Sequence, residues 1–283
     1  MIQVENLSYH YPNSKEATLK GLDFTVEQGE IFGFLGPSGA GKSTTQKILY
    51  KVLKDFKGKV SIQNKALQDW DSSYFQIIGV GFELPNHYLK LTGKENLQLF
   101  SSFYPKEKIK DINTLFEMVG LKESMDKKVS DYSKGMKMRL NFIRALMHDP
   151  EILFFDEPTA GLDPVNAQKI KQHIKDLKQA GKTVFITTHN MNTADELCDR
   201  VAFIAEGELI LTDVPSKLKH QHGKDLVKVE TEQRGNRDFP LERIGQNEDF
   251  LKFIKENELL RMYTDEATLE EVFVKVTGKA LKL

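Results

Sequence analysis

A glycine-rich segment close to the N-terminus limits the folds open to this chain of 283 residues. The segment reads Gly36-Pro-Ser-Gly-Ala-Gly-Lys42-Ser43 and follows the apolar run Ile31–Leu35. It fits the phosphate-loop pattern, in which glycines let the backbone curl so that successive N–H groups point at phosphate oxygens. A helix is predicted over Thr44–Leu53, with Ile48, Leu49 and Val52 on one side, and its positive N-terminus adds to this anion site. Lys42 is expected to reach the β- and γ-phosphates, and the Ser43 hydroxyl to bind Mg²⁺.

An acidic pair follows a second apolar run, Ile152–Phe155. The run predicts a buried strand, and the carboxylate of Asp156 emerges at its C-terminal end, the edge where open α/β sheets bind ligands. Asp156 is expected to hold Mg²⁺ through water, and Glu157 to polarise the attacking water. A solvated turn is the alternative for such a pair, but the upstream phosphate loop favours the functional interpretation.

Two further segments indicate which kind of phosphate-loop protein this is. Tyr132-Ser-Lys-Gly-Met136 opens a predicted helix, where a serine and a glycine can form a second anion-binding site. A plain N-cap serine is the alternative. His189 follows the predicted strand Val184–Thr187. A lone histidine is usually a satisfied surface or core residue, but at a strand end beside a γ-phosphate it is expected to hydrogen-bond that phosphate.

Strand-like and helical segments alternate along the chain and predict a mostly parallel, doubly wound sheet. Residues 92–148 are helical throughout, with one helix over Met136–Leu146. From Pro215 a tail begins, with a weak strand at Leu226–Val229, a polar loop through Gly235-Asn-Arg-Asp and two short helices. The strands expected before the tail are Ile2–Val4, Phe24–Val26, Ile31–Leu35, Lys59–Ile62, Ile77–Val80, Ile152–Phe155, Val184–Thr187, Val201–Ile204 and Leu209–Leu211.

The composition argues against several classes of protein. Lys and Arg number 40 against 41 Asp and Glu, and this balance disfavours a dedicated nucleic-acid binder. The single cysteine, Cys198, excludes an internal disulfide framework and fits a reducing compartment. Apolar stretches such as Val201–Ala205 are far shorter than the roughly 20 residues of a membrane-spanning helix. The chain is therefore expected to be cytosolic and not to cross a membrane itself.

Together these motifs resemble the nucleotide-binding subunit of an ABC transporter over roughly residues 1–215. The segments that carry the resemblance, in the family's order and spacing, are Gly36–Ser43, Tyr132–Met136, Ile152–Glu157, Gly161-Leu-Asp163 and His189. The resemblance implies that two chains pack head to tail, with each ATP held between the phosphate loop of one and the signature serine and glycine of the other. That arrangement explains why one chain carries two anion sites that cannot serve the same nucleotide.

The resemblance also implies roles for individual residues. Glu157 and His189 form the catalytic pair, and Asp163 contacts the other subunit. Tyr11 stands where the family places an aromatic that stacks on adenine, and a half-buried aromatic on an edge strand is the alternative. The residues that face the opposing subunit's nucleotide are Ser133, Lys134, Gly135 and Met136. The implied nucleotide-binding residues are Tyr11, Gly36, Pro37, Ser38, Gly39, Ala40, Gly41, Lys42, Ser43 and Thr44.

The chain departs from the family's commonest pattern at two places. Tyr132, Lys134 and Met136 replace the signature's Leu, Gly and Gln, and the lysine adds a positive charge near the opposing γ-phosphate. The family usually has a glutamine that contacts both Mg²⁺ and the transmembrane partner. Counting back from the helical segment 92–97 places Glu83 at the position of this glutamine. A carboxylate can bind Mg²⁺ at least as well as an amide. A glutamate on a surface loop is the alternative.

The predicted fold class is therefore α/β. It comprises a phosphate-loop ATPase core with a mostly parallel sheet, an N-terminal antiparallel β subdomain and an inserted helical subdomain over about 87–148. A small α+β tail follows. The ATPase domain is expected over 1–214, and an accessory region over 215–283.

The resemblance implies a subunit that uses ATP and Mg²⁺ to power transport through a separate transmembrane permease. A second ATPase subunit, in a homodimer or a heterodimer, completes it, with no nucleic acid and a cytoplasmic location on the inner face of the membrane. Ala267–Phe273 and the signature are similar to exporters of the drug and antibiotic resistance type, which favours export of a drug-like, antibiotic or lipid-like substrate. The alternative is a soluble ABC-type ATPase that acts on a nucleic-acid or ribosomal partner.

Overall fold

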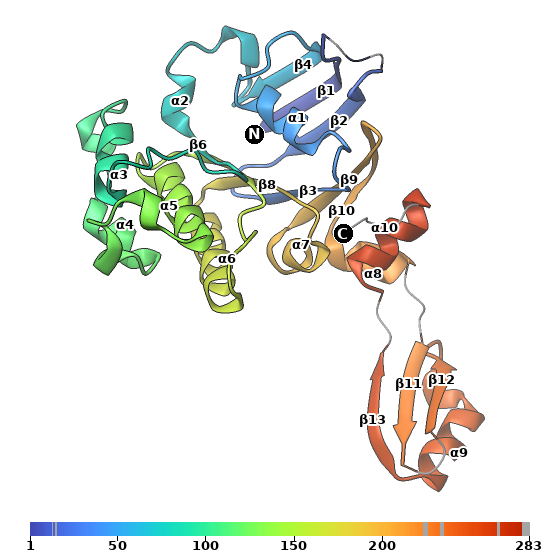
Figure 1. Ribbon diagram of the computed structural model, residues 1–283. Coiled ribbons are helices and arrows are strands. Elements are labelled where there is room, and N and C mark those ends of the chain that lie inside the picture. Colours follow the sequence, from blue (N-terminus) through green and yellow to red (C-terminus); the bar gives the residue numbers. More distant parts are fainter. Residues whose placement is uncertain (13, 15, 223–225, 233–234, 265–266, 279–283) are drawn as a thin grey trace. The chain divides into compact units, whose positions relative to one another are not determined.

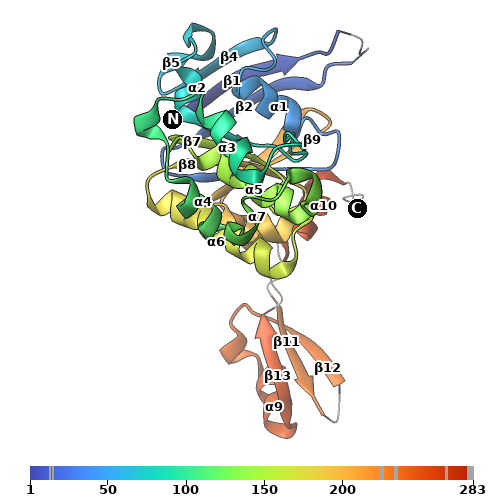
Figure 2. The same cartoon turned by 60° about the vertical axis from the view of Figure 1, so that its left-hand side comes forward.

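The computed structural model describes residues 1–283 except 13, 15, 223–225, 233–234, 265–266 and 279–283. The chain divides into two compact units, of which the first comprises Met1–Thr212 and the second begins at Asp213. Figures 1 and 2 show both units from two directions. Among the described residues, no helix is both long enough and apolar enough to cross a membrane.

A six-stranded sheet runs through the first unit (Figure 1). Its strands are β3 (Ile31–Leu35), β6 (Ile78–Gly81), β7 (Ile152–Asp156), β8 (Thr183–Thr188), β9 (Arg200–Ala205) and β10 (Glu208–Asp213). They are ordered β10-β9-β3-β8-β7-β6. β3 pairs in parallel with β8 and β9, and β7 pairs in parallel with β6 and β8. Every residue of β3 and β8 is buried, which explains their continuous rather than alternating sequences. The mostly parallel sheet predicted from the sequence is confirmed.

A second, antiparallel sheet lies above the first in Figure 1. Its strands are β1 (Ile2–Tyr9), β2 (Leu19–Val26), β4 (Lys57–Ile62) and β5 (Lys65–Ala66), in the order β2-β1-β4-β5. Buried and exposed residues largely alternate along β1 and β2, because only one face of this sheet is covered. The covered face shares one hydrophobic core with the parallel sheet: the ring of Phe24 on β2 lies 5.4 Å from that of Phe34 on β3.

Helices cover the parallel sheet and form the inserted helical region (Figure 2). The helices of the first unit are α1 (Lys42–Leu49), α2 (Tyr74–Ile77), α3 (Gly93–Ser101), α4 (Ile112–Met118), α5 (Lys134–Leu146), α6 (Pro164–Gln179) and α7 (Met191–Leu197). Short 3₁₀ helices cover Leu67–Asp69, Lys106–Lys108, Lys122–Ser124 and Val129–Asp131. Side chains cap several of these helices, and Thr92 and Glu95 form a reciprocal capping box at the start of α3.

Three expectations for the first unit need correction. Helix α1 begins at Lys42 and ends at Leu49, rather than spanning Thr44–Leu53, because the chain leaves helical geometry at Lys51 with φ +62°. Val52 was expected on one side of that helix with Ile48 and Leu49, but it follows the helix and is 62% exposed, whereas those two residues are buried. The strand predicted from Ile77 begins one residue later, since Ile77 closes the unpredicted helix α2.

The second unit consists of two helices and a small sheet backed by a third helix (Figure 1). Its elements are α8 (Pro215–His222), β11 (Leu226–Thr231), β12 (Gly235–Pro240), a 3₁₀ helix (Ile244–Gln246), α9 (Glu248–Glu256), β13 (Leu259–Thr264) and α10 (Leu269–Thr277). The strands are antiparallel in the order β12-β11-β13. Phe250 and Phe253 of α9 pack with Val227, Val229 and Phe239 of the sheet.

Two expectations for the second unit were wrong or incomplete. The polar segment that starts at Gly235 was predicted to be a loop, but it forms the edge strand β12. Its backbone pairs with β11 along its whole length, and of its six residues only Phe239 is buried. β13 was not predicted, because all of its residues are exposed and no alternation marks it.

Candidate functional site

The glycine-rich loop joins β3 to α1, and two of its positions accept nothing larger than glycine. At Gly36, a Cβ atom would lie 2.2 Å from the backbone oxygen of Ile204 on β9. At Gly41, φ is +111°, and a Cβ atom would lie 2.6 Å from the side chain of Leu19. The loop therefore runs in close contact with its neighbours, and this contact fixes its path.

A cavity of about 450 Å³ lies beside this loop, within the size range of small-molecule sites. Its walls come from the loop itself, the segment between β1 and β2, the segment after β6, and the chain just past β7 and β8. The residues that line it are Tyr11, Thr18, Ser38, Gly39, Gly41, Lys42, Ser43, Thr44, Glu83, Asp156, Glu157 and His189. Most of the residues predicted to bind nucleotide or metal thus meet at one place. Thr18 also lines the cavity, and no sequence pattern had pointed to it.

The Lys42 side chain folds back onto the loop. Its Nζ donates to the backbone oxygens of Gly36, at 2.7 Å, and Pro37, at 3.0 Å. Burial lowers the pKa of this ammonium, and the three carboxylates that line the cavity raise it. Neutral carbonyl groups therefore hold this cation, and phosphate oxygens can replace them.

Asp156 ends β7 and is held by two hydroxyl groups. Ser43 donates to Oδ2 at 3.1 Å, and Thr187, its neighbour on β8, donates to Oδ1. These hard oxygen donors, with the nearby Glu83 carboxylate, suit Mg²⁺. Within the described residues, no group of three or more His, Cys, Asp or Glu side chains could hold a metal ion. A metal at this place therefore needs further ligands from a nucleotide or from water.

The next residue, Glu157, is 6% exposed and its carboxylate is closely held. The Thr188 hydroxyl donates to Oε2 at 2.7 Å, and the backbone N–H of His189 donates to Oε1 at 2.8 Å. The His189 ring is also bonded to Oε1 through Nδ1, at 2.5 Å. The Glu157 backbone has φ +50°, in the left-handed region that non-glycine residues rarely adopt. The two predicted catalytic residues are thus in direct contact.

Tyr11 lies in the chain after β1 and lines the same cavity as this pair. Its hydroxyl is 3.3 Å from that of Thr44, and its ring meets Tyr9 edge-on at 4.9 Å. The ring is half-buried and lines the cavity, where an adenine could stack on it.

The signature segment and Asp163 do not line the cavity of their own chain. Ser133 caps α5, and its Oγ accepts from the backbone N–H of Met136 at 3.2 Å. Lys134 crosses the loop before α6, where a Cβ on Gly161 would lie 2.7 Å from its Cε atom. Asp163 caps α6 and accepts from the backbone N–H of Asn166 at 3.0 Å. The residues predicted to bind anions therefore lie at two separate places in one chain.

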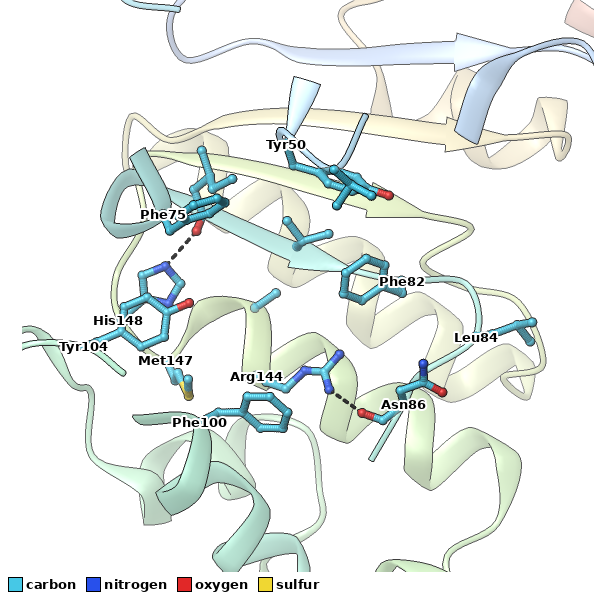
Figure 3. A pocket seen from close by; sticks show the side chains of 14 residues that line it. Tyr50, Phe75, Phe82, Leu84, Asn86, Phe100, Tyr104, Arg144, Met147 and His148 are labelled. Atoms are coloured by element: carbon cyan, nitrogen blue, oxygen red, sulfur yellow. Dashed lines mark hydrogen bonds between the residues drawn. The ribbon is translucent and has the colours of Figure 1, made fainter. Parts of the chain in front are cut away.

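A second cavity of about 450 Å³, here called the apolar groove, lies between β6, α2, α3 and α5 (Figure 3). Large apolar side chains on its walls remain exposed to solvent, among them Val52, Phe75, Phe82 and Leu84. Sequence reasoning missed this groove, because its walls come from segments that lie far apart in the chain and share no common pattern.

Arg144 of α5 points into the apolar groove, although it is only 8% exposed (Figure 3). Its guanidinium donates to the backbone oxygen of Asn86 and to Oδ1 of Asn141, each at 2.7 Å. The rings of Phe100, at 4.8 Å, and Phe82, at 5.9 Å, flank it. Burial lowers the pKa of Arg144 to about 10, and no ion pair between described residues includes it. A buried cation thus faces an apolar cavity with neutral partners.

The sequence matches the ABC transporter family over residues 19–160. With the phosphate loop, the acidic strand end and the histidine brought together on this fold, the chain belongs to the ABC transporter family and is an ATP-binding, ATP-hydrolysing subunit. The resemblance seen in the sequence is confirmed. Cassettes of this family dimerise and work with transmembrane permease subunits.

Individual relatives agree with this assignment. The chain is 47% identical to the fluoroquinolones export ATP-binding protein of Mycobacterium tuberculosis, over 99% of this chain and 94% of the relative. It is 33% identical to the linearmycin resistance ATP-binding protein of Bacillus subtilis, over 98% and 84%. Among solved structures, a dimeric ATP-binding cassette with ADP and Pi bound matches with a TM-score of 0.68 at 29% identity, over 76% of this chain and 98% of that one.

Proposed function

We propose that the chain binds ATP and Mg²⁺ in the cavity beside Lys42 and uses hydrolysis to power export of a drug-like molecule through a separate permease. The observation that carries this proposal is the meeting of Lys42, Asp156, Glu157 and His189 around one cavity. The export direction draws on the similarity to proteins named for fluoroquinolone export and linearmycin resistance.

Lys42 turns from its two carbonyl partners to the β- and γ-phosphates, and the loop's backbone and the start of α1 hold the remaining charge. Ser43, Asp156 and Glu83 hold Mg²⁺, which when bound neutralises charge that builds up on the phosphate oxygens. Tyr11 stacks on the adenine ring. The oxygen donors of this set match the preference of a hard cation.

Glu157 acts as the general base. It accepts a proton from a water molecule while the water oxygen forms a bond to the γ-phosphorus. The bond between that phosphorus and the oxygen bridging to the β-phosphate breaks, and ADP and inorganic phosphate leave. Nδ1 of His189 donates to Glu157, so the ring must carry a proton on both nitrogens for Nε2, on its far side, to donate to a γ-phosphate oxygen.

A second ATPase subunit completes each site. The support is the separation of the signature residues from the cavity, since Ser133 and Gly135 do not line the cavity beside the loop of their own chain. In the dimer, Ser133, Lys134, Gly135 and Met136 face the partner's γ-phosphate, and Asp163 lies at the contact. Either an identical chain or a related one fits this arrangement.

The permease docks in the apolar groove through a short amphipathic segment of a cytoplasmic loop. Val52 and Leu84 stay exposed at its walls, and covering them removes apolar surface from water. Arg144 adds a chemical requirement. Arg144 is buried among aromatic rings and neutral acceptors, so a carboxylate is the partner that would stabilise its charge most. The docking segment therefore carries an aspartate or glutamate at its tip. This contact keeps the subunit at the inner face of the membrane.

Glu157→Gln tests the catalytic assignment. It keeps the shape of the side chain and removes the base, so hydrolysis should fall by about a hundredfold or more. ATP should still bind, and the dimer closed on two ATP molecules should persist and be visible in gel filtration. If the purified chain does not dimerise alone, the experiment is repeated with the permease and any second ATPase present. Hydrolysis at the wild-type rate would remove Glu157 from its role as base.

Export is tested in cells that express the chain together with the permease that copurifies with it from detergent-solubilised membranes. The accumulation of a fluorescent fluoroquinolone is compared between the wild type and Lys42→Ala. Less accumulation with the wild type alone supports export. Equal accumulation with both argues that the transported substrate belongs to another class, while leaving ATP hydrolysis untouched.

A further inference from the structure

Thr188, the last residue of β8, occupies a position between two elements of the active site. It is 1% exposed, and its hydroxyl has a partner on each side. The backbone N–H of Asn190 donates to Oγ1 at 3.0 Å, and the hydroxyl donates to Oε2 of Glu157 at 2.7 Å. Because the Asn190 N–H takes up a lone pair of Oγ1, the hydroxyl proton is directed towards the carboxylate.

The two oxygens of Glu157 are held unequally. His189 supplies two contacts to Oε1, one from its backbone N–H and one through Nδ1. Oε2 receives the Thr188 hydroxyl and keeps a lone pair for another donor. Oε2 is therefore the oxygen that can accept a proton from water while the Glu157–His189 contact stays in place. Its position depends on Thr188, because the left-handed backbone of Glu157 gives the side chain an uncommon starting direction.

The preceding residue, Thr187, holds the carboxylate of Asp156 in the same way, through a hydrogen bond from its hydroxyl. Thr187 donates to Oδ1 of Asp156, its register partner across β7 and β8. Two consecutive threonines at the end of β8 thus hold two consecutive carboxylates at the end of β7. The register of the parallel sheet pairs Thr187 with Asp156, and the next residue along each segment, Thr188 and Glu157, forms the second hydrogen bond. These contacts account for two buried polar residues at the end of an otherwise largely apolar strand.

We propose that Thr188 is a positioning residue for ATP hydrolysis, whose hydroxyl holds Oε2 of Glu157 where it accepts the proton of the attacking water. This inference rests on the proposed role of Glu157 as general base. Thr188 does not touch the nucleotide or the water. It acts through Glu157, and its effect falls on the chemical step rather than on ATP binding.

Thr188→Val tests the inference, because valine has nearly the same shape and lacks the hydroxyl. The kcat for ATP hydrolysis by the purified full chain should fall by about ten- to a hundredfold, the order expected when a catalytic group is misplaced. The KM for ATP should stay within about twofold. Thr188→Ser keeps the hydroxyl and should restore most of the rate. Thermal unfolding of both variants shows whether they fold, and Thr188→Ala replaces the valine variant if that one does not.

Thr183→Val is the matched control. Thr183 begins the same strand, is also buried, and its Oγ1 also has a backbone partner, the N–H of Gly29 at 3.0 Å. This variant removes one buried hydroxyl from β8 at the end away from the cavity. It should lose stability to a similar degree and keep the kcat of the wild type.

Glu157→Gln and the double variant Thr188→Val/Glu157→Gln separate the possible failures. If Thr188 acts through Glu157, the double variant hydrolyses ATP no more slowly than Glu157→Gln alone. A wild-type kcat in Thr188→Val, or an equal loss in Thr188→Ser, overturns the positioning role while Glu157 keeps its own. Wild-type hydrolysis by Glu157→Gln overturns the proposed base, and the inference on Thr188 falls with it. A further loss in the double variant shows that Thr188 acts elsewhere and also refutes the inference.

Discussion

Replacing Lys42 by alanine removes the cation that lies against the phosphate loop. In the structure its Nζ already sits within hydrogen-bond distance of the Gly36 and Pro37 carbonyl oxygens. The side chain is largely buried, so ATP binding orders little that is not ordered already. The entropy cost of ordering this side chain therefore offsets little of the electrostatic attraction between the lysine and phosphate.

The size of the effect follows from the contacts that exchange. A hydrogen bond to a charged group contributes about 1.5–3 kcal/mol net. When ATP binds, the ammonium exchanges its two carbonyl contacts for contacts with phosphate oxygens. We therefore expect Lys42→Ala to lose binding free energy equal to about one hydrogen bond to a charged group. This corresponds to about a ten- to hundredfold weaker affinity. Asp156, Glu157 and Glu83 interact electrostatically with Lys42. Without the lysine, their negative charges repel the nucleotide, so the loss of affinity should lie near the upper end of this range.

Equilibrium binding of a fluorescent ATP analogue measures this loss. Lys47→Ala is the matched control, because Lys47 lies on the same helix α1 and does not line the cavity. Its affinity should equal that of the wild type. Unchanged nucleotide affinity in Lys42→Ala, with thermal unfolding like that of the wild type, would refute the assignment of the phosphate-binding loop.

Three other properties can be measured. Glu83→Gln takes one negative charge from the cavity wall, so half-maximal ATPase activity should need more Mg²⁺; superimposable Mg²⁺ titrations would exclude Glu83 from the metal site. Val52→Glu should prevent copurification of the permease, because it places a charge on the exposed wall of the apolar groove, whereas Ile210→Glu, at an exposed apolar residue outside the groove, should leave the complex intact. Burial lowers the pKa of His87 from 6.5 to about 4, so below pH 6.5 the unfolded chain binds a proton that the folded chain does not. Between pH 7 and pH 5 the chain should therefore lose about 2 kcal/mol of stability in chemical denaturation, a loss that His87→Gln should abolish and whose persistence would point to other groups.

The parts of the site that the sequence predicted are those in which local chemistry dictates local structure. The loop at Gly36–Ser43 needs glycine for its path, and an apolar run that ends in Asp156 leaves few alternatives to a buried strand. The distance along the chain between them does not matter, because parallel strands bring their C-terminal ends to one edge. Counting back to Glu83 likewise selected a residue on the cavity wall, although its role stays a prediction.

The parts that were missed depend on tertiary contacts. β12 has the composition of a loop, and pairing with β11 makes it a strand. The apolar groove exists only because α2, α3 and α5 meet β6, and Val52 had been expected on a buried helix face. Thr188 gave no signal either, since a threonine at a strand end is common and its importance lies in the partner that its hydroxyl reaches across the sheet.

Helix α5 links the two surfaces that the proposed function uses. Its N-terminus is capped by Ser133 of the signature, and Arg144 in its last turn reaches into the apolar groove. The helix has 13 residues and is about 20 Å long. Because its backbone hydrogen bonds are continuous over that length, the signature end and the groove end belong to one rigid element.

The segment 82–86 connects this helix to the cavity beside the phosphate loop. Asn141 of α5 donates to the backbone oxygen of Phe82 at 2.8 Å, and Arg144 donates to that of Asn86 at 2.7 Å. Between these anchors lies Glu83, which lines the cavity, while Phe82 lines the groove. One short segment therefore faces the cavity beside Lys42 on one side and the apolar groove on the other. Because α5 donates to both ends of this segment, the place of Glu83 on the cavity wall is fixed by the same helix that lines the apolar groove.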